Sequence, residues 1–372
     1  MISRAQLDLL NTYLFKGKAI ILFGARQVGK TSLIKAAVKG KTYLWLNGDE
    51  PDTQMLLEKI TSIRLQALVG NNRILVIDEA QMIHNIGLLI KRMVDSFPQI
   101  QVIASGSSAF ELADKTKESM VGRKEEIQVF PLSFSEMVHH TSFIEESRML
   151  PHRLVFGYYP EVVCNPGKEE KILNDLIDGF LYKDILNLEG VKKASTLQRL
   201  VQMLAFRIGS EVNYSSMAND LGVNRLTVEK YIDILEKNFI VFSLSAFSKN
   251  QDNELKKGRK VYFWDNGLRN RIIKKYHPLE FRDDVGALWE NFFISERLKK
   301  LTYEGQQKDT FFWRNAQQAE IDFLEVKNDE IEAYELKYSP KQTVRFTKSF
   351  TGKYHPKATH VVNSENFWEF LL

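Results

Sequence analysis

The stretch AIILFGARQVGKTSLIKAAV, residues 19–38, decides the fold of the N-terminal part of the chain. Its first five residues are apolar, and the residues from Gly24 to Thr31 fit the pattern G-x-x-x-x-G-K-[ST]. Glycines let successive N–H groups turn toward a phosphate, and a helix beginning near Lys30 points its positive dipole end at the same anion. The stretch therefore predicts a strand, a phosphate-binding loop and a helix. A glycine-containing turn before an ordinary helix is the alternative.

The residues of this loop have distinct expected roles in a nucleotidase. Lys30 is expected to reach the β- and γ-phosphates and so to act in catalysis, while Thr31 ligates Mg²⁺ through its hydroxyl group. Gly24 and Gly29 shape the backbone, and Ser32 continues the binding segment into the helix. The loop thus predicts a bound nucleotide with Mg²⁺.

A second motif, RILVIDEAQ at residues 73–81, strengthens this prediction. Four apolar residues end in Asp78 and Glu79, which is typical of a buried parallel strand that delivers carboxylates to its C-terminal end. Ligands of open α/β sheets bind at that end. We expect Asp78 to hold the Mg²⁺ and Glu79 to act as the general base on the attacking water. A strand followed by an acidic helix cap is the alternative.

Three further strands are expected, in TYLWLN from residue 42, QVIASGSS from residue 101 and EEIQVF from residue 125. Because they alternate with helical stretches, they predict a parallel α/β sheet covered on both faces. Arg123 precedes the last strand and could neutralise charge on the transferred phosphoryl group, within one subunit or across a boundary between copies. A solvated surface arginine is the alternative. A homo-oligomer is compatible with the first role.

Length and composition set the limits for the rest of the chain. Its 372 residues suggest two or three domains, and 44% hydrophobic with 26% charged residues is ordinary for a globular protein. A net charge of +4 permits a polyanionic partner without requiring one. The single cysteine, Cys164, excludes an internal disulfide, and neither a signal peptide nor an apolar run of ~20 residues is recognisable. We expect a cytoplasmic protein without membrane spans.

The middle of the chain predicts a helical lid followed by a DNA-binding module. Within residues 214–241, two apolar helix faces flank Gly222, and β-prone segments follow, as in a winged helix. Cations on the second helix and in the wing could contact nucleic-acid phosphates. Winged helices also serve as protein–protein spacers, and surface cations are usually only solvated. The candidate contact residues are Arg225, Lys230, Lys256, Lys257, Arg259 and Lys260.

The stretch AEIDFLEVKNDEIEAYELK, residues 319–337, predicts a hairpin with a two-residue Asn-Asp turn. This register places Asp322 opposite Glu335 and Glu320 opposite Lys337, all on one face. Directly opposed carboxylates repel each other unless a proton or a cation intervenes. The face therefore ends in a charged cluster that invites a cation.

A divalent metal ion is one candidate for that cation. Asp322 and Glu335 would hold it, with the backbone carbonyl of Leu336 as a further ligand, and Lys337 would orient an attacking water. Glu290, on an upstream amphipathic helix, is a candidate additional ligand. The alternative is that Lys337 merely pairs with a neighbouring glutamate on an ordinary edge hairpin.

The Asp, spacer and Glu-x-Lys pattern of this hairpin resembles the core of the restriction-endonuclease-like fold. More widely, the chain resembles a family of prokaryotic AAA-type ATPases whose C-terminal domain of unknown function contains a winged helix and a nuclease-like end. This resemblance implies ATP as the nucleotide, a strand from Gln101 between the other two motif strands, and Ser107 as the γ-phosphate sensor. The motifs that carry it are GARQVGKT, IDEAQ, ASGSS, VGR, PLSFSE, YFWDNGL, FFWRNAQQAEIDF and ELK.

Two positions depart from the pattern of that family. Tyr158 stands in GYYPE where a second glycine is common, and Gln318 replaces a frequent glycine before EID. With these departures, the resemblance still covers nearly the whole chain.

The expected architecture is a parallel α/β P-loop sheet of the AAA type with a helical lid, followed by a winged helix and an α/β restriction-endonuclease-like domain. The expected function is Mg²⁺-dependent ATP hydrolysis coupled to movement of the C-terminal module on DNA. A nucleotide-dependent switch that binds a protein partner or regulates transcription, without cleavage, is the alternative, and a nuclease with structural ATP is a third. The expected domain ranges are 1–132 for the ATPase core, 133–190 for the lid, 191–275 for the winged helix and 276–372 for the nuclease-like domain.

Overall fold

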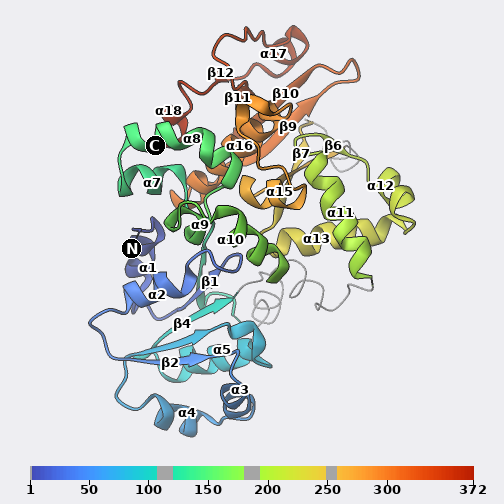
Figure 1. Cartoon of the computed structure of the whole chain (residues 1–372). Helices are drawn as coiled ribbons and strands as arrows, with labels where there is room; N and C mark the ends of the chain where they lie inside the picture. The colour runs from blue at the N-terminus through green and yellow to red at the C-terminus, as the bar shows by residue number, and fades with distance from the viewer. Residues whose placement is uncertain (1, 107–119, 180–192, 249–257) are drawn as a thin grey trace. The chain divides into compact units, whose positions relative to one another are not determined.

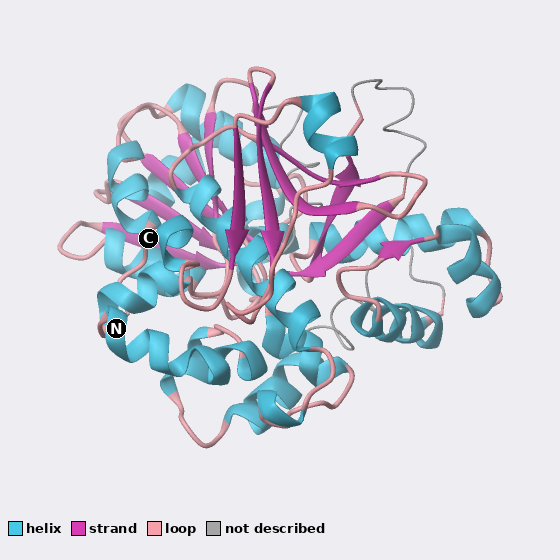
Figure 2. Cartoon of the chain, turned by 90° about the horizontal axis from the view of Figure 1, so that it is seen from above, coloured by secondary structure: helices cyan, strands magenta, loops and turns pink. Residues whose placement is uncertain are grey.

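A computed structural model gives the fold of the chain, shown from two directions in Figures 1 and 2. Among the predicted site residues, Ser107, Lys256 and Lys257 lie outside the described part of the chain. No helix in the described part is long and apolar enough to cross a bilayer. The described residues are 2–106, 120–179, 193–248 and 258–372.

By its internal contacts the chain divides into two compact units, each built around its own sheet. The first unit comprises residues 1–132 and 237–239, and the second comprises residues 133–236 and 240–372. The predicted phosphate loop lies in the first unit, and the predicted hairpin lies in the second.

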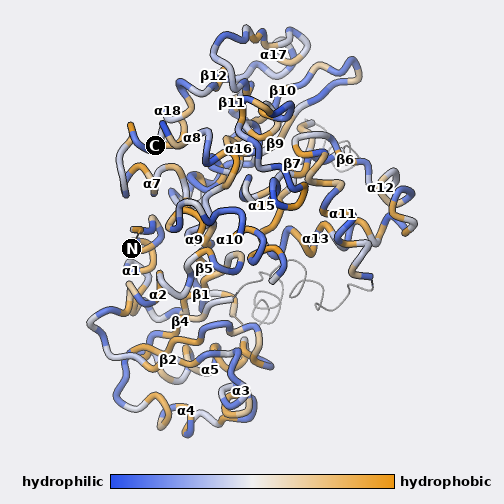
Figure 3. The backbone as a smooth tube through the Cα atoms, viewed as in Figure 1, coloured by the Kyte–Doolittle hydropathy of each residue, from blue (hydrophilic) through white to orange (hydrophobic). Residues whose placement is uncertain are grey.

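The first unit contains a five-stranded, fully parallel sheet in the order β2-β3-β4-β1-β5. All strands expected from the sequence are present, and β4 lies between β1 and β3, as the family resemblance implies. Every residue of β1, β3 and β4 is buried, because central strands of such a sheet are covered on both faces. Hydrophobic colours accordingly follow much of this sheet in Figure 3. The strands are β1 (Ala19–Phe23), β2 (Tyr43–Asn47), β3 (Ile74–Asp78), β4 (Gln101–Gly106) and β5 (Lys124–Gln128).

The helices of this unit connect the parallel strands. Several begin with recognisable start signals: Pro51 occupies the first turn of α3, and the Thr61 side chain accepts a hydrogen bond from the Arg64 N–H at the start of α4. The helix α5 is amphipathic and buries Ile86, Leu89, Ile90 and Met93. The helices are α1 (Gln6–Tyr13), α2 (Lys30–Ala37), α3 (Pro51–Glu58), α4 (Ser62–Val69) and α5 (Ile86–Ser96).

The second unit begins with the helical segment that the sequence predicts as a lid. Ser133 and Glu136 form a reciprocal capping box, which fixes the start of α7. By its contacts this segment packs with the remainder of the second unit. Its helices are α7 (Phe134–His140), α8 (Phe143–Phe156), α9 (Pro160–Cys164) and α10 (Glu169–Leu176).

The next segment of the second unit has the order helix, short strand, two helices and two strands. Gly222 ends α12 in the left-handed conformation that glycine tolerates, so the two predicted helices and the break between them are present. The strand β8 pairs in antiparallel fashion with both β6 and β7. The elements are α11 (Ala194–Phe206), β6 (Glu211–Val212), α12 (Tyr214–Leu221), α13 (Arg225–Lys237), β7 (Val241–Ala246) and β8 (Arg259–Phe263).

The C-terminal segment continues the same sheet. The antiparallel strands β9, β10 and β11 are followed by β12, which is parallel to β11. Because β7 pairs with β9, one seven-stranded sheet runs in the order β12-β11-β10-β9-β7-β8-β6. The elements are α15 (Asn266–Ile272), α16 (Val285–Tyr303), β9 (Asp309–Arg314), β10 (Glu320–Lys327), β11 (Glu330–Leu336), α17 (Lys348–Tyr354), β12 (Ala358–Val362) and α18 (Trp368–Leu371).

The register of the β10–β11 hairpin is the predicted one. Phe323 lies opposite Tyr334, and the two turn residues, Asn328 and Asp329, have φ values of 50° and 65°. A two-residue turn of this kind requires positive φ at both positions, and Asn and Asp tolerate it. Gln318, which replaces the frequent glycine, also has a positive φ of 65°. A glycine would adopt this backbone conformation more readily than glutamine does.

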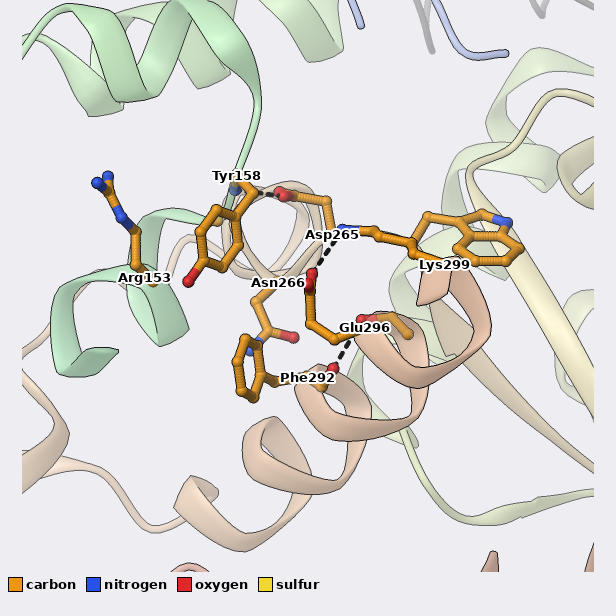
Figure 4. A pocket seen from close by; sticks show the side chains of 10 residues that line it. Arg153, Tyr158, Asp265, Asn266, Phe292, Glu296 and Lys299 are labelled. Carbon is orange, nitrogen blue, oxygen red and sulfur yellow. Dashed lines mark hydrogen bonds and ion pairs between the residues drawn. The ribbon is translucent and has the colours of Figure 1, made fainter. Parts of the chain in front are cut away.

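The departure at Tyr158 lies in a buried network within the second unit (Figure 4). Tyr158 donates its N–H to Asp265 Oδ2 at 2.6 Å, and Asp265 Oδ1 accepts the Leu268 N–H at 3.0 Å, which caps α15. A Cβ on Gly157 would lie 2.1 Å from Asp265, so the glycine before Tyr158 allows this approach. The network encloses only about 10 Å³ of free volume, so it joins segments rather than binding a ligand.

Candidate functional site

The phosphate loop connects β1 to α2 and depends on its two glycines. Gly29 precedes the first residue of α2 with a φ of 95°, which favours glycine. A Cβ on Gly24 would lie 2.0 Å from the carbonyl oxygen of Val129, so only glycine fits there. Both glycines therefore serve the close turn that the sequence pattern predicts.

Lys30 lies within this loop, with only 5% of its surface exposed. Its Nζ donates to the carbonyl oxygens of Gly24 at 2.9 Å and Ala25 at 2.8 Å. Burial lowers the pKa of Lys30 to about 8, although the carboxylates of Glu79 and Asp78 oppose this shift. A phosphate in the loop would supply a negative partner and favour the charged ammonium.

The two residues predicted to hold Mg²⁺ meet at the C-terminal ends of the strands. Thr31 Oγ1 donates to Asp78 Oδ2 at 2.9 Å. Ser105, buried in β4, donates its hydroxyl to the other oxygen, Asp78 Oδ1. Sequence reasoning missed Ser105, although a hydroxyl inside the apolar run QVIASG is the signal that could have identified it. Asp78 is thus held from both sides.

The predicted general base, Glu79, occupies an unusual backbone conformation. Its φ of 49° lies in the left-handed region, where a non-glycine residue costs of order 1–3 kcal/mol. Gln81 donates its amide Nε2 to Glu79 Oε2 at 2.6 Å and so orients the carboxylate. A Cβ on Gly48 would lie 2.3 Å from the Glu79 carbonyl oxygen, so this turn also requires close backbone contact. Gln81 is a second residue that sequence reasoning missed.

Two other predicted nucleotide-site residues, Ser32 and Arg123, are not part of the contacts described above. Ser32 is exposed on α2. Arg123 is 41% exposed and forms an ion pair with Asp95, with Nε and Oδ1 2.6 Å apart. Within one chain, therefore, Arg123 is engaged on the surface, and a role across a subunit boundary would require it to leave Asp95.

The residues of the loop fit a bound Mg²⁺–nucleotide. Backbone N–H groups, a buried ammonium, a hydroxyl and a carboxylate are the donor set that polyphosphate and its metal require. The glycines allow the loop to pass close to Val129 and Arg4, where a Cβ would be crowded. Lys30 would contact the phosphates, and Thr31 with Asp78 would hold the ion.

The charged cluster of the second unit forms where the sequence predicts it. The backbone N–H of Leu336 donates to Asp322 Oδ2 at 2.7 Å, and Lys337 Nζ lies 3.1 Å from the same oxygen. Lys337 also lies 3.2 Å from Glu335 Oε2. Burial and the nearby Asp322 raise the pKa of Glu335 to about 7. Lys337 thus bridges the two opposed carboxylates.

Lys260 differs from its expected role as a phosphate contact in the wing. Only 2% of it is exposed, and its Nζ lies 3.0 Å from Glu290 Oε1 and in contact with Glu320. Tyr262 donates its hydroxyl to the same Glu290 oxygen at 2.6 Å. Side chains alternate along a strand, so Lys260 points inward while Arg259 beside it lies at the surface. Lys260 therefore serves as an internal counter-ion.

These contacts bear on the predicted second metal site. Lys260 and Tyr262 engage Glu290, although burial still raises the pKa of Glu290 to about 7. In the described part of the chain, no three His, Cys, Asp or Glu side chains are placed to share a metal ion. The predicted metal site of Asp322 and Glu335, with Glu290 as an additional ligand, is therefore not shown and stays a prediction.

The candidate nucleic-acid residues on α13 and β8 lie in mixed electrostatic surroundings. Arg225 pairs with Glu229 at 2.7 Å, and Lys230 is exposed. Arg225 and Arg259 line a hollow of about 920 Å³ that also contains carboxylates. This face is therefore not uniformly basic. The acidic lining residues are Glu211, Glu229, Asp233 and Glu236.

Comparisons with known proteins agree with the phosphate-loop geometry. Residues 16–138 match the family model described as AAA domain. Residues 147–277 and 285–368 match two models described as domains of unknown function, DUF8612 and DUF4143 respectively. Known families thus match three successive parts of the chain.

Curated relatives extend over most of the chain. A protein of Haemophilus influenzae, described as uncharacterized, is 26% identical over 331 residues, covering 85% of this chain and 78% of its own. A protein of Mycobacterium tuberculosis is 26% identical over 318 residues, with 84% and 68% covered. A protein of Methanocaldococcus jannaschii is 23% identical over 342 residues, with 78% and 71% covered.

A solved structure shares the fold. The Walker-type ATPase of Pyrococcus abyssi superposes with a TM-score of 0.52 at 13% identity, covering 73% of this chain and 96% of that chain. The AAA match, the parallel sheet and the glycine-shaped loop point to the same architecture. They show that residues 16–138 are similar to an AAA domain and are built on a parallel sheet with a glycine-shaped loop.

Proposed function

We propose that the chain binds ATP with Mg²⁺ and hydrolyses it. The observation that carries this proposal is the 2.9 Å contact between Thr31 and Asp78, beside the buried ammonium of Lys30. These residues come from α2 and β3, which are far apart in sequence and meet at the edge of the sheet where ligands bind. Bound Mg²⁺ would supply neutralisation of phosphate charge.

Each side chain at this edge of the sheet has its own role in ATP binding or hydrolysis. Lys30 holds the β- and γ-phosphates, and Asp78 is fixed by the hydroxyl of Ser105 so that it presents one oxygen toward Thr31. Glu79 accepts the proton of the attacking water, and Gln81 orients its carboxylate. Hydrolysis therefore depends on side chains that the ends of the strands hold in place before the nucleotide binds.

We further propose that nucleotide state controls the second unit, and that this unit acts on DNA. The order α11, β6, α12, α13, β7 and β8 supports a winged helix, in which the exposed Lys230 lies on α13. The elements α16, β9, β10, β11, α17 and β12 support a restriction-endonuclease-like fold, in which Lys337, just after β11, contacts Asp322 on β10 and Glu335 on β11.

The alternative, a switch that binds a protein partner without cleavage, rests on a different observation. The cations of the second unit are largely paired with carboxylates. Lys337 bridges Asp322 and Glu335, and Lys260 bridges Glu290 and Glu320. Arg225 on α13 is paired with Glu229. Cations that neutralise neighbouring carboxylates are less available for phosphates. A mixed-charge face also suits a protein partner with complementary charges.

One set of measurements tests the proposals. Phosphate release from ATP is measured for the wild type, Lys30→Ala and Glu79→Gln, with the exposed Lys16→Ala as the control. We expect the first two variants to lose turnover by a factor on the order of 10² or more and the control to keep it. Turnover unchanged in Lys30→Ala would refute the assigned ATP site.

The same protein preparations distinguish a role on DNA from a nucleotide-dependent switch that binds a protein partner. Binding and cleavage of linear and branched DNA are followed with Mg²⁺ or Mn²⁺ and ATP, beside Asp322→Ala. Cleavage that Asp322→Ala abolishes would establish a nuclease. Salt-dependent DNA binding without cleavage would support a non-cleaving DNA-binding role. ATP turnover without any DNA binding would favour the switch with a protein partner.

A further inference from the structure

The N-terminal segment before α1 contacts the phosphate loop, although no motif includes it. Arg4 donates from Nη1 to the carbonyl oxygen of Val28 and from Nη2 to the carbonyl oxygen of Phe130 at 2.7 Å. The same Nη1 lies 3.3 Å from the position that a Cβ on Gly29 would occupy. One guanidinium group thus joins the phosphate loop to the segment that follows β5.

The orientation of the Val28–Gly29 peptide matters for phosphate binding. In a trans peptide the C=O and N–H point in opposite directions. Because Arg4 holds the Val28 carbonyl on one side, the Gly29 N–H is presented on the other side. A phosphate loop works by turning its N–H groups toward the anion, and an inward carbonyl would repel the phosphate.

This peptide needs an external restraint because of its own sequence. Gly29 adopts a φ of 95°, and glycine occupies many alternative φ/ψ combinations at little cost. The conformational freedom that permits the tight turn therefore also permits the peptide plane to rotate. The planar guanidinium fork fixes two carbonyl oxygens at once, whereas an ammonium is a compact point charge on a flexible chain.

We propose that Arg4 is a positioning residue for ATP binding, which locks the Val28–Gly29 peptide with its N–H toward the phosphates. This inference rests on the proposed ATP site and assigns a role to a residue outside its motifs. Its guanidinium also adds positive charge beside the loop, which favours a polyphosphate.

The chain provides a matched control in Gln6. This buried side chain belongs to the first residue of α1, two positions after Arg4, and its Nε2 donates to the carbonyl oxygen of Gln128 at 3.1 Å. That bond anchors α1 near the end of β5 and does not involve the phosphate loop. Gln6→Ala therefore loosens the start of α1, next to Arg4, without freeing the Val28–Gly29 peptide.

The test uses the full-length protein with Mg²⁺ and a fluorescent ATP analogue. We expect Arg4→Ala to raise the Kd and the KM for ATP by on the order of tenfold or more, the size expected when a charge-assisted hydrogen bond is lost. Its kcat at saturating ATP should change less than about threefold, because Arg4 does not touch the transferred group. Gln6→Ala should keep the wild-type Kd even if its unfolding temperature falls.

Added guanidinium ion gives a readout that a purely structural role would not produce. Millimolar guanidinium chloride, well below denaturing concentrations, should partly restore ATP affinity in Arg4→Ala and leave Gln6→Ala unchanged. Arg4→Lys should bind ATP more weakly than the wild type, because one ammonium does not reproduce the two-carbonyl fork. If Arg4→Ala does not fold, Arg4→Lys carries the comparison.

Two results would overturn the inference. An Arg4→Ala or Arg4→Lys protein that binds ATP as tightly as the wild type would remove the positioning role. Equal losses of affinity in Arg4→Ala and Gln6→Ala would show that Arg4 only anchors α1. A wild type that fails to bind ATP would instead refute the proposed function, on which the inference rests.

Discussion

Replacing Lys260 with Met should destabilise the second unit by removing the counter-ion of Glu290 and Glu320. Lys260 is 2% exposed and contacts both Glu290 and Glu320. Removal of one partner from a buried ion pair costs about 3–5 kcal/mol because the remaining charge is left uncompensated. Both glutamates keep some exposure and Tyr262 still donates to Glu290, so we expect about 3 kcal/mol at pH 8.

The loss should depend on pH in a defined direction. Burial raises the pKa of Glu290 to about 7 in the folded chain, well above its value of about 4.3 in an unfolded chain. The stability gained from a protonated Glu290 is therefore complete below about pH 4.3 and is lost as the pH rises through about 7. Without the positive charge of Lys260, the pKa of Glu290 should rise further, so the carboxyl group stays protonated to a higher pH. The variant should lose less stability at pH 6 than at pH 8.

Urea unfolding followed by tryptophan fluorescence measures this effect, because four of the five tryptophans belong to the second unit. The exposed Lys230→Met is the control for loss of a lysine charge. The double variant Lys260→Met/Glu290→Gln should regain part of the loss, since it removes one unpaired carboxylate. A Lys260→Met protein within 1 kcal/mol of the wild type at pH 8 would refute the role of internal counter-ion.

Three further substitutions test local arguments. Ser105→Ala removes the hydroxyl that holds Asp78, and kcat for ATP should fall about tenfold while KM stays within twofold; an unchanged kcat in steady-state assays would contradict this role. Gly157→Ala places a Cβ against Asp265 at a φ of 75° and should lower the free energy of unfolding, measured in urea, by at least about 2 kcal/mol. An unchanged free energy of unfolding would show that the network around Asp265 can rearrange to accept the extra atom. Gln318→Gly should raise the free energy of unfolding by about 1 kcal/mol, because the φ of 65° suits glycine, and a decrease would show that side-chain contacts outweigh backbone strain.

Several features of this protein follow from short sequence patterns because local chemistry determines them. The phosphate loop needs Gly24 and Gly29 for its turn, and a buried apolar run ending in Asp78 specifies a central parallel strand. The hairpin register follows from the Asn-Asp turn, since strand alternation leaves no further freedom once the turn is fixed. The family resemblance supplied the strand order.

Only the tertiary structure decided which side chains from distant segments meet. Arg4 belongs to no motif and Ser105 had no expected role within ASGSS, yet Arg4 contacts the phosphate loop and Ser105 contacts Asp78. Lys260 looks like a surface cation in KKGRK, but its strand turns it toward Glu290 on a helix about 30 residues later. Local periodicity specifies the face on which a residue lies, and only the packing of distant elements determines what that face meets.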